Sequence, residues 1–215
     1  MTLRHESDVS VADWFTTDPR SDARLGPAGL AAYVRLLLPG REDGVEGHLA
    51  TPELNRLVEV LARHTTTPDR VYFGLWDGYG EIYGGEAVAF LTTFAGPARW
   101  PGRPFRPEPP RTPPPPAFGP DVMDAPRLVH RGQEFLLFGG PLADAGRWGA
   151  RPYGPGLPRD INSPNLFWPA DRAWFVTTHV DETWAGVGGS AALVDDLLRD
   201  PGLETVRTTH PEHHR

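Results

Sequence analysis

The clearest pattern of hydrophobic and polar positions lies between residues 51 and 76, and it predicts a helix followed by a strand. Apolar side chains recur at helical spacing from Leu54 to Leu61. Thr51 is expected to cap this helix, because a hydroxyl followed by a proline and an acid is typical of a helix start. The next apolar run, Val71 to Trp76, is β-branched and aromatic and therefore predicts a strand.

A similar pattern upstream predicts a first helix over residues 27–38, which read PAGLAAYVRLLL. The leucine, tyrosine and valine side chains of this segment recur at helical spacing. Pro27 suits the first turn of a helix, and Pro39-Gly40 is expected to end it. The chain is thus expected to begin with two helices.

Short apolar segments separated by turn residues predict a sheet after residue 76. Asp77-Gly78 is a turn signal, after which the chain is expected to return as an antiparallel strand. Arg131-Gly132-Gln133 is expected to join the strands on its two sides as a hairpin, which Gly139-Gly140-Pro141 ends. The expected strands are Glu81–Tyr83, Val88–Phe94, Arg127–His130 and Glu134–Phe138.

The stretch from Ser163 to Leu198 combines a predicted strand, an acidic turn, a glycine hinge and a predicted helix. Residues Ala173–Val180 alternate in the manner of a strand, with Trp174 pointing inward. Ser190 is expected to cap the final helix, whose apolar residues recur on one face. This strand, turn and helix are expected to complete the sheet and cover its end.

These elements predict an α+β fold with N-terminal helices, a mainly antiparallel meandering sheet and a C-terminal helix. The length of 215 residues fits a single domain over residues 1–215. Residues 97–120 contain 11 prolines, which lack a backbone donor, so this segment is expected to be a long surface excursion that does not join the core. Residues 205–215 are expected to form a disordered tail.

Charge and cysteine content exclude several function classes. A net charge of -7 disfavours a protein that binds the phosphate backbone, so we expect no nucleic-acid partner and favour a basic protein partner. The absence of cysteine excludes disulfides and thiolate chemistry and fits a cytoplasmic location. Neither a signal peptide nor a run of roughly 18 apolar residues is found, so we expect no membrane association.

Polar residues near the C-terminus offer one candidate for catalysis. His179, Asp181 and Ser190 are the residue types of a base, its orienting acid and a nucleophile, although no G-x-S-x-G elbow accompanies them. Gly188, Gly189 and Ser190 precede a predicted helix, where backbone amides could bind an anion. The favoured interpretation is a flexible turn in which Ser190 caps the helix. We predict no metal site and no cofactor, because no ligand spacing or cofactor motif is present.

Aromatic and acidic residues form the candidate binding surface. Tryptophan and tyrosine are enriched in the residues that dominate protein interfaces. The competing interpretation places these rings in the core, except that Trp184 is expected in a loop after the strand, where binding residues concentrate. The candidate binding residues are Trp76, Tyr79, Asp181, Glu182 and Trp184.

Three segments resemble an uncharacterised family of actinobacterial proteins: WDGYG at 76–80, LLFGGPL at 136–142 and SPNLFWPADRAWFVTTHVDETWAGVGGS at 163–190. This resemblance implies one domain of shared architecture and no particular mechanism. In the order of its elements the chain is also similar to the SUKH superfamily, whose members include immunity proteins against polymorphic toxins. The proline-rich insertion departs from the compact form of that superfamily.

The preferred hypothesis is a non-enzymatic, cytoplasmic, immunity-like protein that binds a protein partner through the acidic and aromatic surface. One alternative is a hydrolase or transferase for a small anionic or acyl substrate, with His179 as base, Asp181 or Glu182 as its orienting acid and Ser190 at an anion site. The other is a structural subunit of a larger assembly that docks through residues 97–120. The sequence leaves the oligomeric state open.

Overall fold

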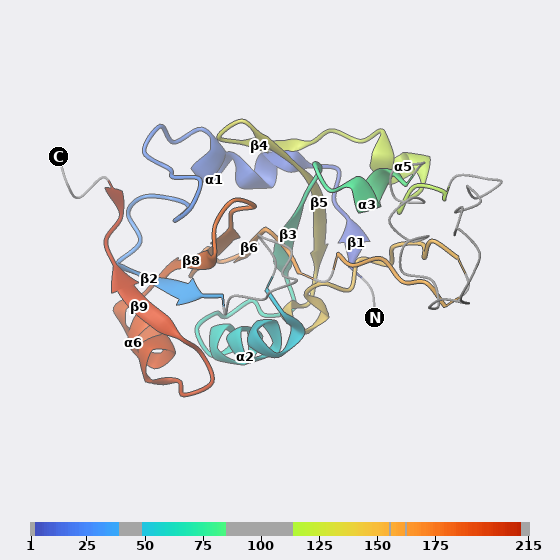
Figure 1. Cartoon of the computed structure of the whole chain (residues 1–215). Coiled ribbons are helices and arrows are strands. Elements are labelled where there is room, and N and C mark those ends of the chain that lie inside the picture. Colours follow the sequence, from blue (N-terminus) through green and yellow to red (C-terminus); the bar gives the residue numbers. More distant parts are fainter. Residues whose placement is uncertain (1–2, 39–48, 85–113, 155, 162, 212–215) are drawn as a thin grey trace, which may run out of the picture.

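The computed structural model describes residues 3–38, 49–84, 114–154, 156–161 and 163–211. In these ranges the chain forms an antiparallel sheet with helices on both faces (Figure 1). The predicted α+β class with a C-terminal helix is confirmed. No helix in these ranges combines the length and the apolar character needed to span a lipid bilayer.

In the described part of the chain, nine strands form one sheet in the order β1-β5-β3-β6-β7-β8-β2-β9, with β4 also paired to β5. Each of these pairings is antiparallel. The strands are β1 (Arg4–His5), β2 (Ala32–Leu37), β3 (Val71–Trp76), β4 (Leu128–His130), β5 (Gln133–Gly140), β6 (Leu166–Pro169), β7 (Phe175–Thr178), β8 (Trp184–Gly189) and β9 (Thr205–Thr208).

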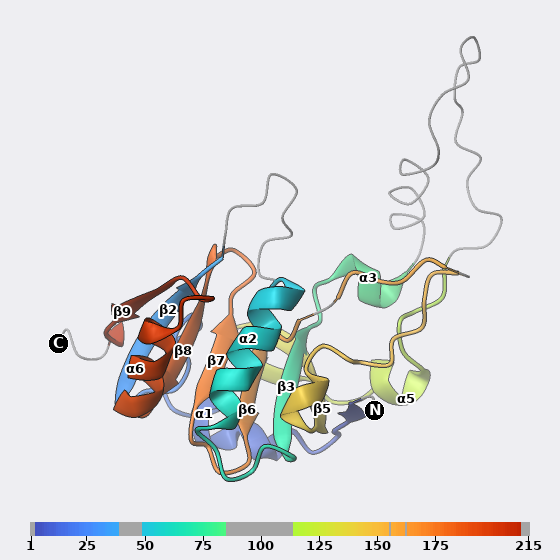
Figure 2. The same cartoon turned by 90° about the horizontal axis from the view of Figure 1, so that it is seen from below.

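Hydrophobic side chains pack on both faces of the sheet. The helices α2 (Thr51–Ala62) and α6 (Ala191–Arg199) cover one face (Figures 1 and 2). The opposite face is covered by the N-terminal 3-10 helix and α1, from which Phe15 packs edge-to-face on Trp168. The remaining helical segments are η1 (Val9–Ala12), α1 (Asp13–Thr16), α3 (Gly80–Tyr83), α5 (Pro120–Met123) and η2 (Leu142–Asp144).

The segments with the strongest local pattern fold as predicted. Both α2 and β3 are present, although the helix cap is Ala50 and not Thr51, which already lies in the first turn. The hairpin of β4 and β5 is confirmed as well. β5 ends at Gly140, directly before Pro141, as predicted, and Gly139 and Gly140 still pair with β3.

The predicted helix over residues 27–38 is wrong, because residues 32–37 form the strand β2. Val34 and Leu36 are buried in the core beneath α6, whereas Arg35 is exposed on the other face. The apolar residues of this segment fit helical spacing and strand alternation about equally well. Pairing with β8 and β9 on its two sides supplies the backbone hydrogen bonds that decide for a strand.

The predicted return strand Glu81–Tyr83 is also wrong. These residues form the helical turn α3, in which Ile82 is fully buried and accepts a hydrogen bond of 2.7 Å from the Ala117 N–H. The neighbours of β3 are instead β5 and β6, which come much later in the chain. The predicted strand Val88–Phe94 lies outside the described residues.

The proline-rich segment joins the core at its C-terminal end. Of residues 97–120 the structure describes 114–120. Ala117 and Phe118 are buried in the main hydrophobic core, and Phe118 packs against Phe138 with ring centroids 5.3 Å apart. The expectation that this segment stays outside the core is therefore wrong for these residues.

A single buried arginine connects this segment to two others. Arg159 is 6% exposed, and its guanidinium donates hydrogen bonds to the carbonyl oxygens of Glu81, Pro115 and Arg151. Proline has no N–H with which to form a backbone ladder, so a side-chain donor takes the place of that ladder here. Arg159 thereby joins α3, the proline-rich segment and the loop before β6.

The predicted disordered tail is ordered through most of its length. Residues Thr205–Thr208 form β9 beside β2. His210 is 1% exposed, with its ring 5.1 Å from that of Tyr33 and its Nε2 donating to the Gly26 carbonyl at 3.2 Å. Residues 212–215 lie outside the described residues.

Candidate functional site

Most of the predicted binding residues lie at one end of the sheet. Because neighbouring strands are antiparallel, the C-terminal ends of β3 and β7 meet the N-terminal end of β8 there. Figure 2 shows β3 running into α3 at the end where β7 turns back into β8. Trp76 ends β3 and Trp184 begins β8, with about 14 Å of sheet width between these strands. These residues share one end of the fold without forming a single contact cluster.

Tyr79 is buried at this end, so the prediction that it is an exposed binding residue is wrong. It is 7% exposed, and its hydroxyl accepts a hydrogen bond of 2.8 Å from Asn165 Nδ2. Burial raises the pKa of Tyr79. The Trp76 ring packs edge-to-face on the Tyr79 ring, with centroids 5.0 Å apart, and the backbone N–H of Trp76 donates a hydrogen bond of 2.9 Å to Asn165 Oδ1. Trp76 and Tyr79 therefore support the sheet end from within.

The turn between β7 and β8 presents one exposed acid and one paired acid. His179 fixes the turn, since its Nδ1 accepts from the Asp181 N–H at 3.2 Å and its carbonyl from the Glu182 N–H at 3.0 Å. The Asp181 side chain is 79% exposed. Glu182 instead forms an ion pair with Arg24. Asp181 is therefore the acid at this turn that a partner can reach.

Trp184 is half-buried at the start of β8 and not in a loop as predicted. The guanidinium of Arg35 lies 4.4 Å from the centroid of its ring, a cation–π distance. The two side chains meet because Leu37 of β2 pairs with Trp184, which places Arg35 one diagonal step away on the same face. The helix predicted over residues 27–38 hid this contact, which strand alternation in that segment would have revealed.

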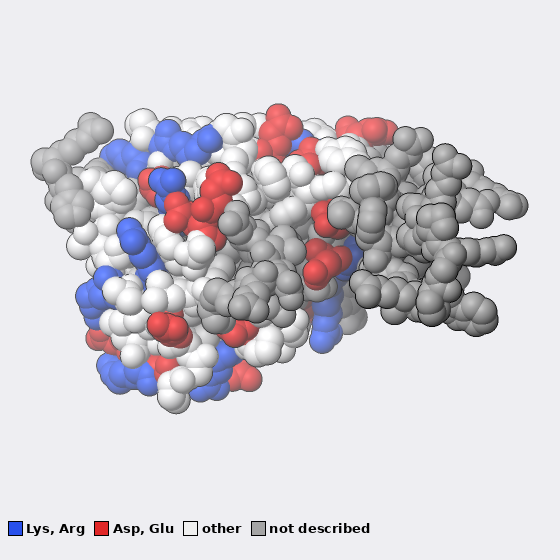
Figure 3. All heavy atoms as spheres, viewed as in Figure 1, with Lys and Arg blue, Asp and Glu red and all other residues white. Residues whose placement is uncertain are grey.

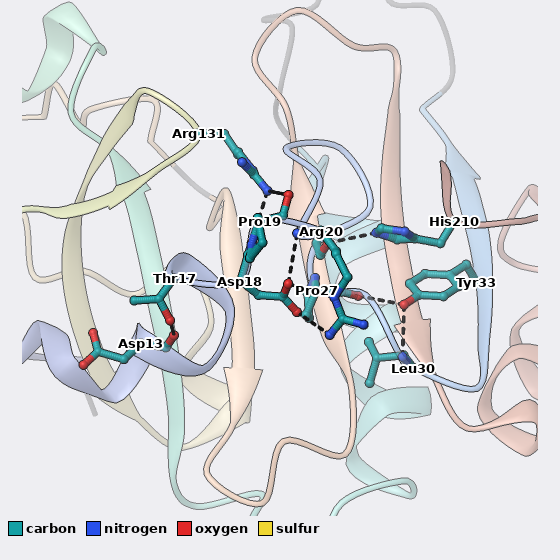
Figure 4. Close-up of polar contacts among 11 residues, drawn as sticks. Asp13, Thr17, Asp18, Pro19, Arg20, Pro27, Leu30, Tyr33, Arg131 and His210 are labelled. Carbon is teal, nitrogen blue, oxygen red and sulfur yellow. Dashed lines mark hydrogen bonds and ion pairs between the residues drawn. The ribbon is translucent and has the colours of Figure 1, made fainter. Parts of the chain in front are cut away.

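The loop of residues 18–27 lies over the sheet and brings Arg24 to Glu182. Side chains from later parts of the chain hold its carbonyl groups in place (Figure 4). The Tyr33 hydroxyl, for example, donates to the Pro27 carbonyl at 2.7 Å. The donors to this loop are Tyr33, Arg131, Thr177 and His210.

His130 lies beneath the same loop and couples the stability of the fold to pH. It is 3% exposed, and its Nε2 lies 3.4 Å from the Asp22 carbonyl oxygen. Burial, reinforced by the positive charge of Arg131, lowers the pKa of His130. Below the unfolded-state value of about 6.5 the unfolded chain then binds more protons than the folded chain, so falling pH favours unfolding.

We expect the free energy of unfolding to decrease below about pH 6.5, by at most about 1.4 kcal/mol per pH unit from this one group. Urea unfolding of the wild type and His130→Gln on both sides of that pH measures the effect. The decrease should be smaller in His130→Gln, which cannot gain a proton. An equal decrease in both proteins would show that His130 does not contribute.

The fold does not bring the three candidate catalytic residues, His179, Asp181 and Ser190, into one site. His179 follows β7 and Ser190 follows β8, so they lie at opposite ends of β8, about 20 Å apart along the strand. Ser190 Oγ accepts a hydrogen bond of 3.1 Å from the Leu193 N–H, which confirms its predicted role as helix cap. His179 Nδ1 lies 3.8 Å from Asp181 Oδ2. These distances exclude direct proton transfer between His179 and Ser190.

Gly188 and Gly189 are buried strand residues and not a flexible hinge. They pair with Tyr33 and Ala32 of β2. An added Cβ would lie 2.7 Å from the Tyr33 ring at Gly188 and 2.6 Å from Leu193 at Gly189. Glycine is present here because the sheet packs closely, and this part of the predicted anion site is not exposed.

Charge is mixed on the face seen in Figure 3, where acidic and basic side chains are interspersed. Over the described ranges, no group of three or more His, Cys, Asp or Glu side chains could hold a metal ion.

The chain matches no known family model, no curated protein and no solved structure.

Proposed function

We propose that the chain is a non-enzymatic protein-binding domain that contacts its partner through Arg35, Asp181 and Trp184, hereafter the turn surface. The observation that carries this proposal is the carboxylate of Asp181, whose side chain is 79% exposed. Asp181 lies three residues before Trp184, whose ring stacks with the guanidinium of Arg35. Tryptophan and arginine are enriched among the residues that dominate binding energies. The exposed carboxylate suits a partner with a basic group at the matching position.

An immunity-like role is the form of this proposal that the sequence favours. Its supports are the similarity in element order to the SUKH superfamily and the net charge of -7, which favours a basic partner. The enzymatic alternative loses support from the separation of His179 and Ser190. The alternative of a structural subunit rests on residues 97–120, most of which lie outside the described ranges.

Alanine substitutions in the turn surface test the proposal. A partner is recovered from the native host with the wild-type protein as bait, identified, purified and titrated against each variant. We expect Trp184→Ala and Asp181→Ala each to weaken binding by about 2 kcal/mol, roughly thirtyfold, as hot-spot residues do.

Val129→Ala is the matched control, because Val129 is an exposed apolar strand residue (54%) on β4, far from the turn surface in the order of strands. It should leave the affinity unchanged. Thermal unfolding of each variant separates lost binding from lost folding. Unchanged affinities for Trp184→Ala and Asp181→Ala in folded proteins would refute the turn surface.

A further inference from the structure

Among the residues that the structure describes, the last strand leaves one edge of the sheet open. β9 is the terminal strand in the sheet order and pairs with β2 alone among the described strands (Figure 1). The Leu37 N–H donates to the Glu204 carbonyl at 2.8 Å, which fixes the alternation of the ladder. The backbone N–H and C=O groups of Val206 therefore form hydrogen bonds with β2, whereas those of Thr205 and Arg207 point away from the sheet. Such an edge is a template for another strand.

Exposed apolar side chains flank this edge on both faces of the sheet. Val206 is 51% exposed on the face that carries Arg35. Leu198 is 36% exposed on the other face, in the stripe of α6 that begins at Asp195, and Asp195 pairs with Arg207 of β9. Among the described residues, five large hydrophobic side chains are exposed, and these two adjoin β9. An unpaired strand edge flanked by exposed apolar side chains is a surface to which another strand can add.

We propose that β9 pairs with β9 of a second copy of this chain, antiparallel and with the two-fold axis at Val206. In this register each Thr205 exchanges both outward backbone hydrogen bonds with Arg207 of the second copy. The alternation of the ladder requires this, because Thr205 and Arg207 are the outward-bonding residues. Val206 then faces its own equivalent across the axis, which buries both exposed side chains.

The charges of β9 favour this register over its neighbour. With the axis at Val206, Arg207 lies opposite Thr205, and Glu204 lies opposite Thr208. With the axis at Arg207, two guanidinium groups would face each other, which is unfavourable for a cross-strand pair. Arg207 already has its counter-charge in Asp195 of its own chain, so the interface needs no further acid. The edge is thus self-complementary.

This dimer involves neither Asp181 nor Trp184, although Val206 pairs with Arg35, the third residue of the turn surface. Trp184→Ala should leave the dimer intact, and Val206→Thr, which adds no charge beside Arg35, should leave the turn surface in place. Failure of either proposal is therefore recognised without affecting the other.

Engineered cysteines test the register directly, since the native chain contains no cysteine. Opposed residues in this type of pair have Cβ atoms about 4.5–5.5 Å apart, and a small adjustment brings them to disulfide distance. We expect Val206→Cys to form a covalent dimer under mild oxidation. Arg207→Cys should not, because the two α-carbons would be roughly 8 Å apart, beyond the reach of a disulfide. Val129→Cys, equally exposed on β4, is the control for random collision.

Sedimentation equilibrium of the cysteine-free proteins tests the dimer itself. The wild type and Val206→Thr should sediment at twice the mass of the chain, whereas Val206→Asp should dissociate at least tenfold more readily, because it places two carboxylates in contact. Far-UV circular dichroism verifies that each variant is folded. A monomeric wild type, a Val206→Asp protein as tightly dimeric as the wild type, or cross-linking at position 207 or 129 as fast as at 206 would overturn the proposal.

Discussion

Replacing Arg159 by alanine is expected to lower the free energy of unfolding by about 3 kcal/mol or more. The substitution leaves three carbonyl oxygens without their donor, and a buried polar group without a partner costs about 1–3 kcal/mol. These losses are not fully additive, because the three carbonyls share one guanidinium. We expect the packing around Pro115 to be disturbed most, because Arg159 joins otherwise separate segments there.

Urea unfolding measures this effect, and two variants serve as controls. Arg159→Lys keeps the charge but lacks the planar fork that reaches several carbonyls, so it should recover only part of the loss. Arg147→Ala removes an arginine whose side chain is 63% exposed and whose ion pair with Asp144 is local, and it should cost less than about 1 kcal/mol. A loss for Arg159→Ala as small as that for Arg147→Ala would contradict the role assigned to Arg159.

Gly186→Ala is expected to lower the free energy of unfolding by about 2–4 kcal/mol, an unusually large effect for one methyl group. The added Cβ would lie 2.1 Å from the Arg24 carbonyl oxygen and 3.1 Å from the Leu25 α-carbon. Both are backbone atoms, so no side chain can rotate to make room. The loop of residues 18–27 would have to lift off β8, and Arg24 would lose its ion pair with Glu182.

Gly80→Ala is the matched control for this substitution. Gly80 lies at the start of α3, has no atom within 4 Å of an added Cβ and does not have a positive φ. Alanine should therefore be neutral or stabilising by up to about 1 kcal/mol, because it favours the helix. Equal stabilities for the two variants would exclude close packing of the loop on β8.

The sequence predicts well those elements whose signals are local. α2 has its apolar stripe and its proline start within one segment, and β3 is a continuous β-branched and aromatic run. Tertiary pairing decided the elements that were predicted incorrectly. The apolar residues of β2 fit both helical and strand spacing, and the segment forms a strand because β8 and β9 flank it. Phe118 is buried because Arg159 donates a hydrogen bond to the backbone carbonyl of Pro115 in the segment before it.

The candidate site divides in the same way. Asp181 and Trp184 could be singled out from an acidic turn beside an aromatic residue, since those features are contiguous in the sequence. Arg35 and Arg24 could not, because their contacts depend on the register of β2 and on a loop held by residues more than a hundred positions away. The burial of Tyr79 is not evident from the sequence, because the partner of its hydroxyl, Asn165, lies at the end of a strand that is distant along the chain.

The position of β2 also affects how the chain can fold during its synthesis. β2 is synthesised well before its two neighbours, β8 and β9, which lie about 150 residues further along the chain. At the usual speeds of translation the strand waits on the order of ten seconds before either partner exists. Throughout that interval both of its edges and its apolar face are exposed. We therefore expect a nascent chain of this kind to need shielding by the ribosome or a chaperone until β8 and β9 have been made.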